Sequence, residues 1–183
     1  LEIENVDTDQ IIPARFLKAT ERIDFDKNLF RDWRYNQDNT IKKDFVLNSK
    51  IYFGKILVAG KNFGSGSSRE HAVWALYDYG FRCVISSFFA DIFKNNCLNI
   101  GVLPVQISDD FLQLIFDSIK KNPNVKLKIN LIEQEVSISD VLHKEKFEIN
   151  PYKKENMMNG FDDIDYLLNM KSEIKNFASK RPY

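Results

Sequence analysis

Three short apolar runs, separated by helical patterns, are the feature of this sequence that most restricts its fold. The runs have the length and the residue types of buried strands and lie at residues 56–59, 83–85 and 102–105. The segments between them predict one helix from about residue 68 to 79 and another from 88 to 96. Strands that alternate with helices at this spacing are typical of βαβ units, so we expect a parallel sheet.

The rest of the chain adds further helices and a second set of strands. Residues 108–121 predict an amphipathic helix capped by Ser108, and residues 125–149 alternate polar and apolar positions as antiparallel strands do. Residues 24–44 form a polar stretch typical of a long loop with short helical turns. We therefore expect one α/β domain over residues 1–183, with a mixed sheet, flanking helices and a helical tail from about residue 150.

The composition excludes several classes of protein. Lys+Arg and Asp+Glu both number 26, and this zero net charge argues against a general nucleic-acid binder. Two cysteines and two histidines at distant positions form no metal-binding pattern, so we expect no metal site on this chain. No apolar run approaches the roughly 18 residues of a membrane span, and the expected compartment is the cytoplasm.

The loop at residues 60–72 carries the strongest chemical signal. Gly64 and Gly66 permit backbone conformations and close ligand contacts that other residues do not allow. The loop leads into a helix N-terminus, which favours an anion, and Arg69 adds a guanidinium suited to a carboxylate. The stretch lacks the Gly-Lys-Ser/Thr of a phosphate-binding loop and has Arg69 where a dinucleotide fingerprint needs a small residue. The sequence thus predicts an anion site with two hydroxyl groups, those of Ser67 and Ser68.

Residues 67–70 also fit a structural role. Ser67 and Glu70 have the spacing of a capping box, with Ser67 as N-cap and Glu70 as the third helical residue. His71 has no His or Cys neighbour in the sequence and is interpreted as a scaffold residue. Residues 5–13 leave two interpretations open: a turn with a helix start, or a site in which Asp9 orients a cation such as Arg69.

Several stretches together resemble one known family, the small subunits of 3-isopropylmalate dehydratase in the aconitase superfamily. The residues that carry the resemblance span most of the chain, at 7–13, 29–34, 44–48, 62–72, 89–93 and 157–160. The resemblance implies the swivelling β/β/α domain of aconitases and a heterodimer with a large subunit that carries a [4Fe–4S] cluster. It implies the isomerisation of 2-isopropylmalate to 3-isopropylmalate by dehydration and rehydration, a step of leucine biosynthesis.

The resemblance also assigns roles to residues of the loop and its surroundings. Ser67 is the expected base, as its alkoxide, and Arg69 is expected to bind a substrate carboxylate. Further substrate contacts are expected from Thr8, Asp9, Arg15, Gly64, Ser65, Gly66 and Ser68, and support for the site from Glu70 and His71. Another positively charged residue between residues 15 and 34 could bind the substrate carboxylate in place of Arg15. The segment 16–35 is expected to sense the substrate side chain, although residues 23–26 depart from the glycine-containing stretch usual in the family.

Two alternatives to this function remain open from the sequence. One keeps the chemistry but changes the substrate to citramalate, homocitrate or a related hydroxy-diacid. The other is a non-catalytic module that binds an anion or RNA, against which the zero net charge argues.

Overall fold

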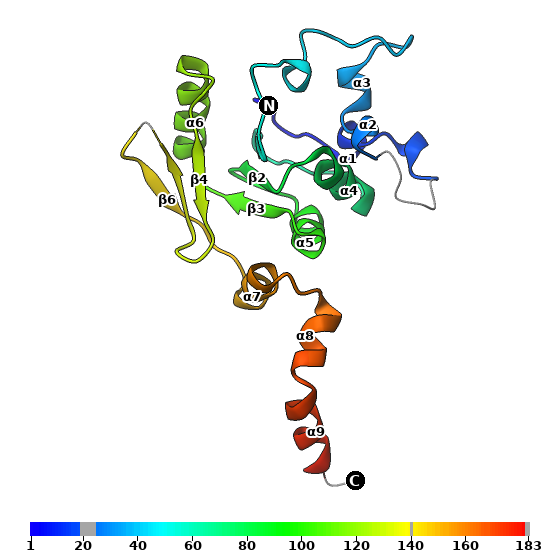
Figure 1. Ribbon diagram of the computed structural model, residues 1–183. Coiled ribbons are helices and arrows are strands. Elements are labelled where there is room, and N and C mark those ends of the chain that lie inside the picture. The colour runs from blue at the N-terminus through cyan, green and yellow to red at the C-terminus, as the bar shows by residue number, and fades with distance from the viewer. Residues whose placement is uncertain (19–24, 140, 182–183) are drawn as a thin grey trace. The chain divides into compact units, whose positions relative to one another are not determined.

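The computed structural model describes residues 1–18, 25–139 and 141–181 (Figure 1). Contacts divide the chain into two compact units, Leu1–Glu148 and Ile149–Tyr183. The division falls close to the start of the expected tail. Each unit is described below by itself.

A parallel sheet forms the centre of the first unit. Its strands β1 (Ile56–Val58), β2 (Cys83–Ser86) and β3 (Leu103–Gln106) lie in the order β1-β2-β3. Every residue of β2 is buried, which explains why the strands are continuous apolar runs without a polar face. The predicted parallel sheet is confirmed.

Two helices follow the first two strands of this sheet and contact each other. They are α4 (Glu70–Tyr79) and α5 (Asp91–Ile100), and each ends at a glycine with a positive φ, Gly80 or Gly101. Glycine ends helices in this way because it has no Cβ to oppose the left-handed conformation. Both helices begin two or three residues later than the sequence predicts, since the preceding residues belong to loops that bond to neighbouring segments.

An antiparallel sheet forms the other part of the first unit. It consists of β4 (Leu127–Asn130), β5 (Glu135–Ile138) and β6 (Lys144–Lys146), paired in sequence order. Helix α6 (Asp109–Lys121) precedes it, capped by the Ser108 hydroxyl as predicted. The backbone N–H and the hydroxyl of Ser108 also donate to the Glu145 carboxylate, which joins the start of α6 to β6. The expected parallel and antiparallel strands are thus both present, in separate sheets.

Short helices form the N-terminal segment, and two of them, α1 and α2, contact α4. They are α1 (Thr8–Ile11), the 3₁₀ turns η1 (Ala14–Phe16) and η2 (Val46–Asn48), α2 (Phe25–Asn28) and α3 (Arg31–Arg34). This agrees with the predicted loop with helical turns at residues 24–44, except for Asp24, which is outside the described residues. Ile11, Phe25 and Phe30 are fully or almost fully buried and join the core formed by the sheet and α4. The segment is therefore anchored by its apolar side chains.

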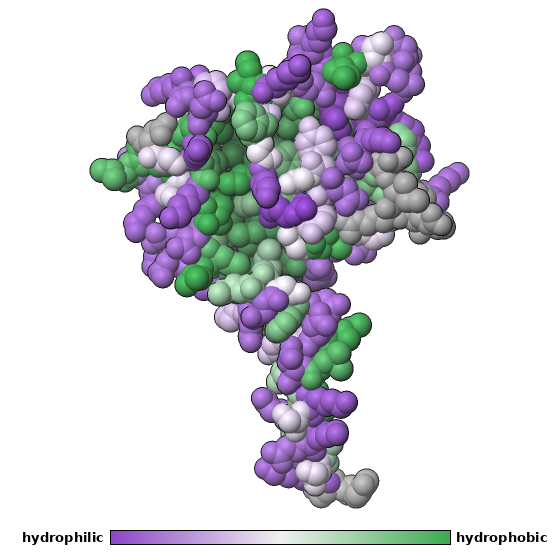
Figure 2. All heavy atoms as spheres, in the orientation of Figure 1, coloured by the Kyte–Doolittle hydropathy of each residue, from purple (hydrophilic) through white to green (hydrophobic). Residues whose placement is uncertain are grey.

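The second unit consists of helices α7 (Pro151–Asn159), α8 (Asp163–Asn169) and α9 (Lys171–Ser179). Asn150 caps α7, and Gly160 ends it at φ +68°, as expected for the Asn-Gly break. Apolar side chains of α8 and α9 are exposed, and Figure 2 shows hydrophobic residues among the hydrophilic ones on these helices. Across the described parts of the chain, no helix combines the length and the apolar character needed to cross a membrane.

Candidate functional site

The loop between β1 and α4 is held by hydrogen bonds on both sides. On one side the N–H groups of Gly64 and Ser65 donate to the carbonyl of Val6, at 2.8 and 3.2 Å. On the other side the Phe63 N–H donates to the Phe88 carbonyl at 3.1 Å, and the Ala90 N–H donates to the Phe63 carbonyl at 3.3 Å. The loop therefore lies between the N-terminal segment and the loop that precedes α5, and its shape is fixed by both.

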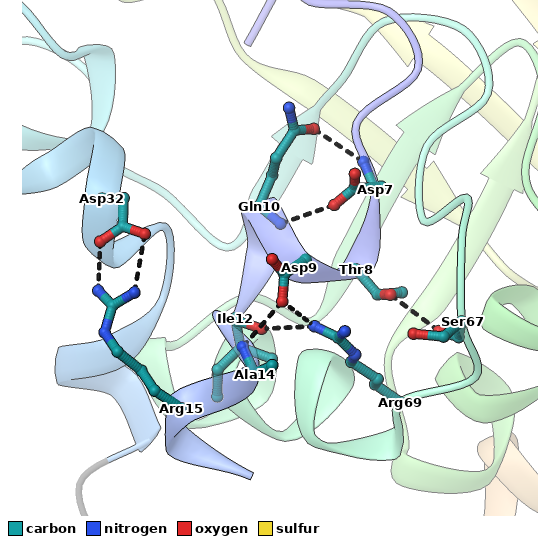
Figure 3. A network of polar contacts seen from close by, with 10 residues as sticks. All are labelled: Asp7, Thr8, Asp9, Gln10, Ile12, Ala14, Arg15, Asp32, Ser67 and Arg69. Atoms are coloured by element: carbon teal, nitrogen blue, oxygen red, sulfur yellow. Dashed lines mark hydrogen bonds and ion pairs between the residues drawn. The ribbon is translucent and has the colours of Figure 1, made fainter.

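Thr8 extends the first of these contacts to the proposed catalytic serine. Its N–H donates to the Ser65 carbonyl at 2.9 Å, and its hydroxyl donates to the Ser67 carbonyl at 2.8 Å (Figure 3). The Thr8 side chain is almost fully buried, at 3% exposure, so this bond is shielded from water. Thr8 thus fixes the backbone on which the Ser67 hydroxyl is mounted.

Gly64 allows the start of α5 to approach the loop. Gly64 has a φ of +80°, and a Cβ built on it would lie 2.1 Å from Cγ of Phe93. Real Cβ contacts are never this short, so the Phe93 ring occupies the space that any other residue would need. This packing places the first turn of α5 beside the serine loop.

Ser67 itself is exposed and is not the N-cap of α4. The helix begins at Glu70, its N-cap residue is Arg69, and no side-chain cap bond forms. The predicted capping box is therefore wrong. Hydrogen bonds to the N-terminal segment and to the loop before α5 hold residues 63–67 outside the helix. Glu70 is therefore the first helical residue, whereas a capping box requires it to be the third. The Ser67 hydroxyl is left without a hydrogen-bond partner among the described residues, although its carbonyl has one.

Asp9 holds Arg69 in place. The Asp9 carboxylate forms an ion pair with the Arg69 guanidinium, whose Nη1 also donates to the Ile12 carbonyl at 3.3 Å (Figure 3). Asp9 is itself positioned by the Ala14 N–H, which donates to it at 2.8 Å. The hydrogen bond from Arg69, together with that from Ala14, lowers the pKa of the Asp9 carboxyl below its usual value. The two interpretations of residues 5–13 are compatible with each other, because Asp7 caps α1 and Asp9 pairs with Arg69, while a role of Asp9 in a functional site stays a prediction.

A cavity of about 260 Å³ lies over these residues. Its lining consists of Thr8, Gly64, Gly66, Ser67, Ser68, Arg69, Ala90, Asp91, Ile92, Phe93 and Asn96. Six of the residues selected from the sequence therefore share one cavity. Ser65, Asp9, Arg15, Glu70 and His71 are not part of its lining, although Asp9 reaches it through Arg69 and Ser65 through its bond to Thr8. The cavity is small, which suits a metabolite of a few carbons better than a nucleotide.

Sequence reasoning did not assign the α5 side of this cavity. Residues 89–93 carry part of the family resemblance, but the pattern alone gives them no chemical role. The signal that could have found them is topological. Loops that follow adjacent parallel strands meet at the same edge of a sheet, so the loop after β2 is a natural neighbour of the loop after β1.

Arg15 and the segment 16–35 lie in a different environment. Arg15 forms an ion pair with Asp32 and extends toward it in Figure 3, not toward the Arg69 guanidinium. Its Nη1 donates to Asp32 at 3.0 Å. Arg15, Arg31 and Tyr35 are among the residues that line a second, larger cavity of about 1060 Å³ with mainly polar and charged walls. Within the described residues, this segment does not contribute to the lining of the Ser67 cavity.

Two other cations of the range 15–34 are Arg34 and Arg22. Arg34 is buried and donates to the backbone carbonyls of Asp26 and Leu29, so it supports the fold of this segment. Arg22, and residues 23–24 of the stretch that departs from the family, are outside the described residues. The substrate contact expected from Arg15 therefore stays a prediction.

Glu70 and His71 occupy the first turn of α4. Glu70 is exposed. The half-buried ring of His71 packs against Trp74, at 4.6 Å between ring centroids, and against Phe25 at 5.6 Å. These contacts are those of a residue that anchors α4 to the N-terminal segment.

The cysteines do not fit an iron–sulfur cluster on this chain. Cys83 and Cys97 are free and buried, and burial raises the pKa of both thiols. A cluster needs several thiolates that can reach the iron. Among the residues that the structure describes, no group of three or more His, Cys, Asp or Glu side chains could hold a metal ion.

The chain is similar to known proteins over its whole length. The aconitase C-terminal domain family matches residues 1–110. The 3-isopropylmalate dehydratase small subunit of Cytophaga hutchinsonii is 59% identical over 183 residues, which cover all of this chain and 91% of that protein. The proteins of the same name from Azobacteroides pseudotrichonymphae and Karelsulcia muelleri are 58% and 55% identical, each over all of this chain and 93% of the relative.

A solved structure has the same fold. The crystal structure of 3-isopropylmalate dehydratase (leuD) from Methanocaldococcus jannaschii superposes with a TM-score of 0.66 at 29% identity. The match covers 94% of this chain and 92% of that one. The predicted α/β fold of the aconitase C-terminal domain is confirmed by this likeness and by the family match.

Proposed function

Since this chain belongs to the 3-isopropylmalate dehydratase small-subunit family, we propose that it works with a large subunit to convert 2-isopropylmalate into 3-isopropylmalate in leucine biosynthesis. The observation that carries the proposal is one cavity of about 260 Å³ whose lining includes both Ser67 and Arg69. A base and a carboxylate-binding cation are the two groups that dehydration of a hydroxy-diacid requires from one side of the substrate.

Arg69 binds a substrate carboxylate in this proposal. Its side chain is only 16% exposed, and its contacts with Asp9 and the Ile12 carbonyl fix the direction of the guanidinium. A guanidinium has five N–H donors, so contacts to these two groups leave donors for a ligand. A pre-oriented donor loses little entropy when the substrate binds.

Ser67 accepts the proton from the substrate carbon next to a carboxylate. The C–H bond breaks, its electron pair forms the carbon–carbon double bond, and the hydroxyl group leaves the neighbouring carbon as hydroxide, which takes a proton from solvent to become water. In the rehydration a water molecule gives its hydroxide to the other carbon and its proton to solvent, and Ser67 returns its own proton to carbon, so the isomerisation consumes no other reactant. The Ser68 hydroxyl and the backbone N–H groups of the loop support the negative charge that develops.

The hydroxyl group needs an activating cation that this chain does not supply from its described residues. We place a [4Fe–4S] cluster on the large subunit, where it would act as a Lewis acid on the hydroxyl of the bound substrate. The thiols of Cys83 and Cys97 are buried and cannot reach a cluster, which supports its placement on the large subunit. Two free cysteines also suit a reducing compartment, and we propose that the complex works in the cytoplasm.

The test is activity after anaerobic mixing with the iron–sulfur large subunit. We expect neither subunit to be active alone and the mixture to interconvert 2- and 3-isopropylmalate. Ser67→Ala should abolish turnover, by at least about 100-fold for loss of a positioned base, while the complex still assembles. Ser172→Ala is the matched control, because Ser172 is exposed on α9 and lies outside the cavity.

Two results would contradict the proposal in different ways. Full activity of the Ser67→Ala complex would remove Ser67 from the role of base. A wild-type complex that turns over a shorter or a tricarboxylic hydroxy-acid but not 2-isopropylmalate would assign the chain to a related dehydratase.

A further inference from the structure

We propose that Ile92, on the first turn of α5, determines the substrate specificity of this site by packing against the branched alkyl group of the bound hydroxy-diacid. The inference rests on the proposed function and names a residue that recognises the part of the substrate not involved in the reaction. It adds the start of α5 to the parts of the chain from which side-chain recognition is expected.

The walls of the cavity differ in chemistry. The β1–α4 loop supplies hydroxyl groups and a guanidinium, through Ser67, Ser68 and Arg69. The α5 side supplies apolar groups, through Ala90, Ile92 and Phe93. A substrate whose carboxylate binds Arg69 can therefore direct an alkyl group toward α5, where burial of apolar surface is favourable.

Ile92 is the most exposed of the apolar residues on the α5 side of the cavity. Phe93 is only 2% exposed, because its ring packs on Gly64 and on Phe63 and Phe89. Ala90 has a single side-chain carbon. Ile92 is 55% exposed, so a large part of its side chain is available to contact a ligand.

Ile92 is an exposed aliphatic residue on a helix whose core contacts are made by other side chains. A helix that packs on a core normally buries its aliphatic residues, and α5 buries Phe93 and Cys97 in this way. Ile92 contributes little to that core, yet it lines the cavity that contains Ser67. A role in binding explains an exposed isoleucine at this place better than a role in folding.

Asp91 makes the same wall unfavourable for a charged branch. It is exposed, lines the cavity beside Ile92, and is not placed in an ion pair within the described residues. A third carboxylate directed toward α5 would meet this negative charge, whereas an isopropyl group would not. The pair Asp91 and Ile92 therefore favours an apolar branch over an acidic one.

The test compares two substrates in the reconstituted complex. Ile92→Ala should lower kcat/KM for 2-isopropylmalate by about 10- to 200-fold, the range for lost methylene contacts in a pocket. The value for 2-methylmalate, whose branch is one carbon, should change much less. If 2-methylmalate is not turned over, its inhibition constant as a competitor serves for the comparison. Ile92→Val should give an intermediate loss for the isopropyl substrate.

Ile51→Ala is the matched control, because Ile51 is 58% exposed and does not line the cavity. It should leave both substrates unaffected. Equal losses for both substrates with Ile92→Ala, or weaker binding of the large subunit, would overturn the inference in favour of a structural or interface role. If Ile92→Ala leaves the ratio of kcat/KM for the two substrates unchanged in an active complex, the inference is also overturned, while the proposed function stands. A wild-type complex inactive on 2-isopropylmalate would refute the proposed function, and the inference with it.

Discussion

A methyl group at Gly64 should destabilise the protein more than the same group at Gly101. The two glycines have similar positive φ angles, +80° and +89°, so replacement by alanine costs each about 1–2 kcal/mol of conformational energy. Their surroundings differ. The new Cβ would lie 2.1 Å from the buried Phe93 ring at Gly64, but 3.7 Å from the Tyr77 ring at Gly101, an ordinary contact.

Overpacking of a core side chain costs about 1–3 kcal/mol. We therefore expect Gly64→Ala to lower the free energy of unfolding by about 2–5 kcal/mol, and Gly101→Ala by only the backbone share of about 1–2 kcal/mol. For a chain of this size each kcal/mol lowers Tm by roughly 2–4 °C.

Urea unfolding of the two variants measures this difference. The added variant Phe93→Leu identifies its source, because a smaller side chain should relieve the clash. We expect the double variant Gly64→Ala/Phe93→Leu to lose less free energy of unfolding than the two single variants lose together. Equal losses at Gly64 and Gly101, or additive effects with Phe93→Leu, would refute the argument that the ring of α5 excludes a side chain from the serine loop.

Three further outcomes follow from the contacts of α1 with the loop. Asp9→Asn should lower kcat/KM of the complex by about 10- to 100-fold, because Arg69 loses its orientation. The pKa of Asp9 is lowered by its Arg69 and Ala14 hydrogen bonds, so the carboxylate stabilises the fold above its ordinary value of 3.8 and loses this effect as pH falls through the lowered value. Because Asp9 is 56% exposed, the stability gap to Asp9→Asn should stay below about 1 kcal/mol at pH 7 and close in acid, as urea titrations at several pH values would show. Thr8→Val should cost about 1–2 kcal/mol in the same assay, since it removes the hydroxyl that donates to the Ser67 carbonyl.

The sheets could be predicted from the sequence because local pattern and tertiary environment agree in them. The apolar runs 56–58 and 83–85 lie in strands with mostly buried residues, and the alternation around Val136 and Ile138 matches buried positions of β5. The predicted cap at Ser108 is confirmed, because its hydroxyl oxygen accepts from the Phe111 N–H while its O–H donates to Glu145, and the two bonds do not exclude each other. In these elements the residues that define the pattern are also those that the fold buries.

The start of α4 could not be predicted in the same way. Ser67 and Glu70 have the spacing of a capping box, but the helix begins at Glu70 because hydrogen bonds from Thr8 and to Val6 hold the preceding loop in another conformation. These partners lie about 60 residues away in the sequence. A local rule cannot weigh contacts that exist only after the N-terminal segment has packed beside the loop.

The site as a whole follows from the order of the strands more than from any one motif. The loop after β1 carries Ser67 and Arg69, and the loop after β2 leads to Asp91 and Ile92. Because β1 and β2 are adjacent and parallel, both loops leave the same edge of the sheet, and the bridge between Phe63 and Phe89 joins them directly. A sequence motif shows the polar wall alone, since hydroxyl groups and a guanidinium are conspicuous in a glycine-rich loop. The apolar wall consists of residue types that are common in every core, so only the adjacency of the two strands distinguishes Ile92 as a residue that lines the cavity.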